Sequence, residues 1–131
     1  MKGTTSYDVG SRPHPDLALV AIGALMLVIR HKALQNTLPR NGFAGLRTKA
    51  SKHCEACWQA MHRTAAPWLL AGAVQALVGA ATTGMLYLVA ADRAEYAAGV
   101  IASVAFVVSG ILLLIGGFLG NRAASAVSEH V

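Results

Sequence analysis

The residues that could carry chemistry are concentrated in one polar stretch, residues 41–70, which reads NGFAGLRTKASKHCEACWQAMHRTAAPWLL. Its candidate metal ligands are His53, Cys54, Cys57 and His62. Zinc needs four ligands that converge on one point. On a helix His62 would lie about 140° around the axis from Cys57, so these four side chains do not converge. We therefore expect no metal site.

The two cysteines form a C-x-x-C motif with three alternative readings. A haem attachment site is excluded because Trp58 stands where that motif requires His. A redox-active pair remains open, although no thioredoxin-like pattern surrounds it. We favour two free structural thiols, because the charge pattern described below places them in the reducing cytoplasm. No nucleophile stands with a base and an orienting group, so we expect neither an enzyme nor a cofactor.

The same stretch has helical periodicity. Its apolar residues recur at i, i+3, i+4, i+7 and i+11, namely Cys54, Cys57, Trp58, Met61 and Ala65. The polar residues fall largely on the other side, namely Lys52, Glu55, Gln59, His62 and Arg63. Ser51 is the expected N-cap, and Trp58 the expected anchor at the membrane surface. This pattern predicts an amphipathic interfacial helix that runs into a membrane span near Pro67.

The segment before this helix is rich in turn-forming residues. Pro39, Gly42 and Gly45 predict a loop rather than a helix. Arg47 lies in this loop close to the expected membrane surface. Its guanidinium could bind a phosphate, a carboxylate or a helix C-terminus.

The rest of the chain indicates a membrane protein. Of its 131 residues 55% are apolar and only 13% charged, and the apolar residues come in long blocks. We predict an all-α membrane protein with three transmembrane helices, at 17–34, 65–91 and 97–120, and with the cytoplasmic interfacial helix between the first two. A signal peptide is disfavoured for the first block, because the basic cluster follows it and no cleavage site is evident. Asp16 is the expected N-cap of the first span.

Charge sets the expected orientation. Seven Lys and Arg residues lie between Arg30 and Arg63, and few lie in the other connections. Because positive loops stay inside, we expect an extracytoplasmic tail at 1–16, a cytoplasmic segment at 35–64 and a cytoplasmic tail at 121–131. The pI near 9.7 then reflects topology and contact with anionic lipids of the bilayer rather than nucleic-acid binding.

Pairs of small residues occur on the spans, such as Gly116 with Gly120 and Gly99 with Ser103. Such pairs let helix backbones approach closely. They are consistent with packing inside the chain and, equally, with a homodimer.

The polar stretch also resembles a known family. Asn41, Gly45, Arg47 and Thr48 are similar to the N-x-x-x-G-x-R-T signature of the SdpI family, small bacterial membrane proteins named after a toxin-immunity protein. The E-x-x-W-x-x-x-H-R that follows is matched by Glu55, Trp58, His62 and Arg63. This resemblance implies a bacterial inner-membrane protein that uses these eight residues to bind a partner.

Two functions follow from the resemblance and the span pattern. The first is binding, with immunity against a membrane-active peptide toxin as its role. The alternative is a small accessory subunit of a larger membrane protein complex, docked through its small-residue helix faces.

Overall fold

The computed structural model describes residues 14–40, 45–90 and 93–131. Within these ranges the chain forms four helices and no strand: α1 (Pro15–Leu34), α2 (Lys49–His53), α3 (Glu55–Val89) and α4 (Ala94–Ser128). The predicted all-α fold is confirmed. Asn41, the first residue of the family signature, lies outside the described residues.

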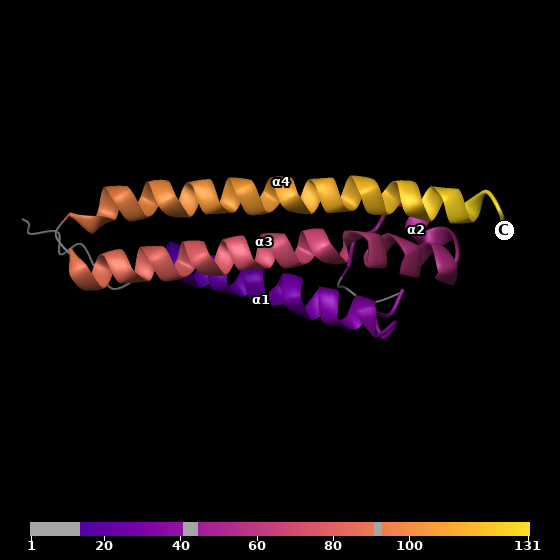
Figure 1. Ribbon diagram of the computed structural model, residues 1–131, viewed down its shortest axis with the longest axis horizontal. Coiled ribbons are helices and arrows are strands. Elements are labelled where there is room, and N and C mark those ends of the chain that lie inside the picture. Colours follow the sequence, from indigo (N-terminus) through magenta and orange to yellow (C-terminus); the bar gives the residue numbers. More distant parts are fainter. Residues whose placement is uncertain (1–13, 41–44, 91–92) are drawn as a thin grey trace, which may run out of the picture.

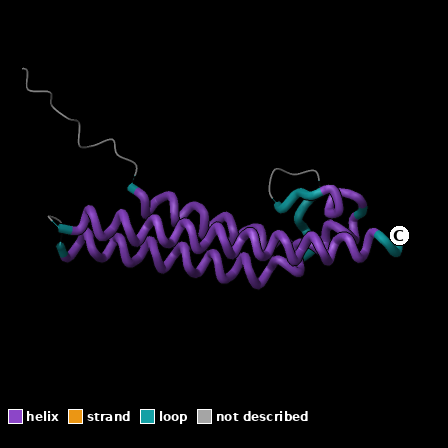
Figure 2. The backbone as a smooth tube through the Cα atoms, turned by 90° about the horizontal axis from the view of Figure 1, so that it is seen from above, coloured by secondary structure: helices purple, strands orange, loops and turns teal. Residues whose placement is uncertain are grey.

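The three long helices lie side by side, with α3 between α1 and α4 (Figures 1 and 2). Helices α1 and α4 run in one direction and α3 runs in the other. The short helix α2 therefore lies at the same end as the start of α3 and the C-terminus (Figure 1). This arrangement brings the polar segment before α3 against the last turns of α4.

Three helices, α1, α3 and α4, are long and apolar enough to cross a membrane. Helices α3 and α4 have 35 residues each, which corresponds to about 52 Å, whereas a hydrocarbon core is about 30 Å thick. Large apolar side chains cover the outside, for example Leu88 at 84% and Leu114 at 73% exposure. Such a surface is suited to lipid, and the chain is a multi-pass membrane protein.

Small residues form the contact between α3 and α4. A Cβ added at Gly79 would lie 2.6 Å from the Cβ of Ala105, and one added at Gly120 would lie 2.6 Å from the Met61 carbonyl oxygen. The Gly116 and Gly120 pair is therefore used for packing within the chain, one of its two expected uses. By contrast, a Cβ at Gly99 would meet no atom within 4 Å.

Helix α1 begins one residue before its expected cap. Pro15 is its first residue and His14 its N-cap, with no side-chain capping bond. Asp16 lies in the first turn instead, so its prediction as the cap is wrong. Proline is favoured at the first helical position because its missing N–H would have no partner there.

The amphipathic segment is divided between two helices. Its first part is α2, and its second part forms the opening turns of α3, continuous with the span. Cys54, with extended φ and ψ of −146° and 164°, separates them. Thr48 caps α2, so the prediction of Ser51 as N-cap is wrong: Ser51 is the third residue of the helix and completes a capping box.

Candidate functional site

The polar segment is held to α3 by two buried aromatic rings, Trp58 and His62, each 1% exposed. The backbone N–H of Leu46 donates to Nε2 of His62 at 2.9 Å. The indole N–H of Trp58 donates to the carbonyl of Leu38 at 3.0 Å. We call this set of contacts, together with Gly45, the loop latch. It satisfies two backbone groups that irregular structure would otherwise leave without partners.

The latch requires a neutral His62. Its Nδ1 lies 2.8 Å from the Trp58 carbonyl oxygen, which can only accept, so Nδ1 carries the proton and Nε2 is free to accept from Leu46. Burial lowers the pKa of His62 from its ordinary 6.5, and the hydrogen bond to the Trp58 carbonyl opposes this shift only in part. His62 lies in the first turns of α3, before the segment 65–91 that is expected to cross the membrane.

Gly45 lies directly against the two rings. Its φ of 121° is unfavourable for any residue with a side chain. A Cβ there would lie 2.7 Å from Nε2 of His62 and 3.1 Å from the Trp58 ring. Glycine is therefore required for two reasons: its backbone adopts a positive φ, and no room is left for a side chain.

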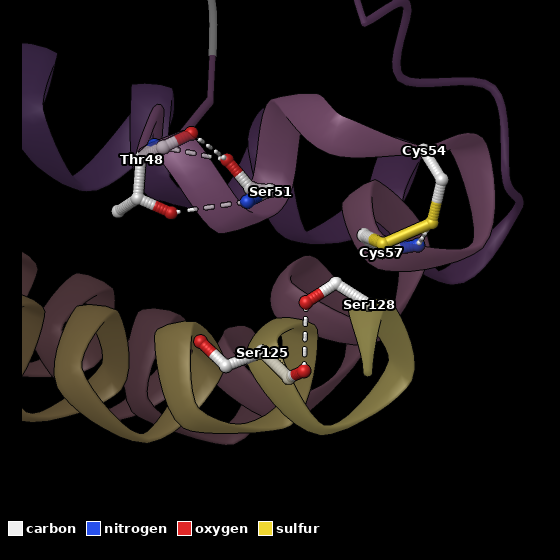
Figure 3. The surroundings of a disulfide bond; sticks show 6 residues. All are labelled: Thr48, Ser51, Cys54, Cys57, Ser125 and Ser128. Atoms are coloured by element: carbon white, nitrogen blue, oxygen red, sulfur yellow. Dashed lines mark hydrogen bonds between the residues drawn. A yellow bond between two sulfur atoms is a disulfide. The ribbon is translucent and has the colours of Figure 1, made fainter. Parts of the chain in front are cut away.

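Thr48 and Ser51 fix the turn between the latch and α2 (Figure 3). The Thr48 hydroxyl accepts from the Ser51 N–H at 3.1 Å, and the Ser51 hydroxyl accepts from the Thr48 N–H at 2.9 Å. The buried Ser51 hydroxyl also donates to backbone carbonyls, that of Leu46 lying at 3.4 Å. The signature threonine thus shapes the loop.

A groove of about 410 Å³ opens between this loop and α4. Its polar lining consists of Arg47, Thr48 and Asn121. The Arg47 side chain is exposed, and one of its terminal nitrogens donates to the Arg40 carbonyl at 3.3 Å. The apolar lining consists of Leu46, Met61, Leu113, Leu114, Gly117 and Phe118. A cation beside apolar walls suits an amphipathic ligand with an acidic group.

The structure brings together part of the predicted site. Gly45, Trp58 and His62 form the latch, and Arg47 and Thr48 line the adjoining groove. Two expectations are wrong: Trp58 is no anchor at the membrane surface, and His62 is not on a polar outer face. Both rings are buried because the loop folds back over them.

Glu55 and Arg63 are exposed. Glu55 accepts a hydrogen bond from Gln59 at 3.4 Å. Among the hydrogen bonds of the described residues, none joins Glu55 or Arg63 to the latch. Their expected part in a binding surface stays a prediction.

The cysteines differ from expectation. Cys54 and Cys57 are joined in a disulfide, so the prediction of two free thiols is wrong (Figure 3). Their spacing across the start of α3 brings the sulfurs together, a geometry that a single continuous helix over this segment did not suggest. In the described part of the chain, no three His, Cys, Asp or Glu residues are grouped to hold a metal.

Sequence reasoning missed the α4 side of the groove. The apolar pattern predicts only a span that continues into a polar tail. Four residues of this span and tail nevertheless line the groove opposite Arg47, namely Leu113, Gly117, Phe118 and Asn121. A signal was present in Asn121, a polar residue that directly follows the long apolar run. Which loop it faces depends on how α3 and α4 align.

Comparison with known proteins identifies the family. No curated protein and no solved structure matches the chain. A family model, that of the SdpI/YfhL protein family, matches residues 37–130. The match extends beyond the signature through the latch, the groove and both helices of the α3–α4 hairpin. The chain therefore belongs to the SdpI/YfhL protein family.

Proposed function

We propose that this protein acts by binding and that it protects a bacterial cell against a membrane-active peptide toxin. The ligand lies in the groove between the loop and α4, with its acidic group on Arg47 and its apolar part along α4. Lipid headgroups and partner proteins are the competing occupants. The protein is not an enzyme.

The observation that carries this proposal is the position of Arg47 beside an apolar groove whose lining includes Leu46 of the latch. The guanidinium is exposed and, among the described residues, it donates to one backbone carbonyl, so donors remain for a carboxylate or phosphate. The latch uses Trp58 and His62 internally. These two signature residues therefore build the surface, and Arg47 contacts the ligand.

The groove lies on the cytoplasmic side of the inner membrane in this proposal, with the N-terminus outside and the C-terminus inside. The excess of Lys and Arg between Arg30 and Arg63 supports this orientation. A green fluorescent protein fused after Val131 should fluoresce, and alkaline phosphatase at the same position should be inactive. The reverse pattern would place the groove outside.

A survival assay tests the binding function. The protein is expressed in a sensitive bacterium, which is then challenged with the peptide toxin against which the family's namesake protects. We expect survival to rise with the wild-type protein and to return to the level of the empty vector with Arg47→Ala. Membrane levels of each variant are measured in the same cells, so that loss of protein is not mistaken for loss of function.

Lys52→Ala provides the matched control. It removes one positive charge from the same segment, but Lys52 is an exposed residue of α2 that does not line the groove. Its survival should equal that of the wild type. Equal killing with and without the wild-type protein would count against immunity, and equal protection by both variants would exclude Arg47 as the binding group.

The accessory-subunit alternative has one observation in its favour. The outer face of α4 carries Gly99 and Gly110, at which an added Cβ would meet no atom within 4 Å. Such open small residues would allow another helix to approach closely. Purification from native membranes in mild detergent discriminates: a stoichiometric larger partner favours the subunit role, whereas a monomer or homodimer favours direct binding.

A further inference from the structure

The Cys54–Cys57 disulfide closes the junction between α2 and α3, and neither the latch nor the groove explains it. Cys54 is the N-cap of α3 and separates the two helices. Its sulfur is bonded to Cys57 and also accepts the backbone N–H of Cys57 at 3.0 Å (Figure 3).

The two sulfurs have unequal surroundings. Cys57 is fully buried, with 0% exposure, whereas Cys54 is partly exposed. The Cys54 sulfur lies at the N-terminus of a 35-residue helix, where backbone N–H groups favour an anion. Cys54 is therefore the cysteine that an aqueous thiol can reach, as an exchanging cysteine needs to be.

The buried cysteine, Cys57, packs against residues that line the groove. Cys57 packs with Met61 and Ala124 in one apolar cluster, against which Leu46 also packs. Met61 and Leu46 line the groove, and Leu46 supplies the N–H of the latch. The disulfide therefore lies in the same cluster as two residues that line the groove.

We propose that Cys54 and Cys57 form a reversible dithiol–disulfide couple that controls the groove. The thiolate of a cytoplasmic thiol attacks the Cys54 sulfur, the bond between the two protein sulfurs breaks, and Cys57 leaves and takes up a proton. A second thiol then attacks the mixed disulfide and releases Cys54. Two electrons reduce the protein disulfide, and two small thiols are oxidised to one disulfide.

The oxidised state holds the junction as the structure shows it, and reduction loosens α2 and the latch. On the cytoplasmic side a disulfide of this kind is transient and redox-sensing rather than permanent. The control of ligand binding and the cytoplasmic source of the thiol rest on the function and orientation proposed above, whereas the exchange itself requires only a small thiol.

Thiol trapping tests the couple. The full-length protein in nanodiscs is equilibrated with mixtures of reduced and oxidised dithiothreitol, quenched with acid and labelled with a maleimide polymer. The chain has two cysteines, so the reduced protein gains two labels and the oxidised protein none, and the gel separates the two states. We expect complete, reversible conversion in one two-electron transition. A disulfide that resists reduction until the protein unfolds would overturn the proposal, as would reoxidation only between chains.

Hydrogen exchange tests the link to the groove. On reduction the protection of the Leu46 amide should fall roughly tenfold, as for loss of a short cross-link, while that of Ala76 in the middle of α3 should not change. The Cys54→Ser/Cys57→Ser variant should match the reduced protein under both conditions. Conversion without any change at Leu46 would overturn the control of the groove. Neither readout uses a toxin, so failure of the immunity function would be seen separately.

Discussion

Replacing Gly45 by alanine is the sharpest perturbation of the loop latch. The φ of 121° costs about 1–3 kcal/mol for a residue with a side chain. The new Cβ would also lie 2.7 Å from Nε2 of His62, so the ring must move and the 2.9 Å bond from Leu46 is lost, at a net cost of about 0.5–1.5 kcal/mol. Together these two costs should destabilise the latch by about 1.5–4.5 kcal/mol.

Hydrogen exchange at the Leu46 amide measures this cost directly. A loss of about 1.5–4.5 kcal/mol in the free energy of opening corresponds to roughly 10- to 2,000-fold faster exchange. Gly110→Ala is the control, because a Cβ there meets no atom within 4 Å. Its Leu46 amide should exchange at the wild-type rate. If the Gly45→Ala protein also exchanged at the wild-type rate, the latch would not depend on this glycine and the reasoning would be refuted.

Three further predictions concern the same end of the molecule. Burial lowers the pKa of His62, so the stability that neutral His62 contributes is complete above the ordinary value of 6.5 and is lost as the pH falls through the lowered value. The melting temperature should therefore decrease in acid, and His62→Gln should reduce this pH dependence. Gly120→Ala should destabilise the helix pair by about 1–3 kcal/mol in thermal unfolding, whereas Gly99→Ala should not. Trp58→Phe should keep the packing but free the Leu38 carbonyl, costing about 1–3 kcal/mol.

Each of these has an outcome that contradicts it. A pH profile identical in the wild type and His62→Gln would show that the imidazole does not titrate in the latch. Equal melting temperatures for Gly120→Ala and Gly99→Ala would mean that α3 and α4 do not approach as closely as described. A Trp58→Phe protein with wild-type stability would remove the indole bond as a support of the loop.

The sequence predicts the apolar helix face that carries Trp58, but it does not predict that the loop folds back over this face. Trp58 has the helical spacing of an apolar face, and that face exists, but periodicity does not say whether lipid or protein covers it. The Leu38 carbonyl and the Leu46 N–H cover it here. The same limit explains why the pattern places His62 on the polar side. Periodicity does not show that a backbone N–H and a carbonyl satisfy its two nitrogens, and with these partners a histidine can be buried.

The order of the amino acids is enough to show that the chain is helical, that three of its segments can cross a membrane, and that its polar residues gather in one segment between the first two. These properties follow from composition and spacing, which act within each segment. The folded chain was needed to show that the Gly45 loop folds over Trp58 and His62, that α4 completes a groove beside Arg47, and that Cys54 bonds to Cys57. The loop's contacts with α3 and α4 depend on how the helices align in space, because they join residues far apart in the chain.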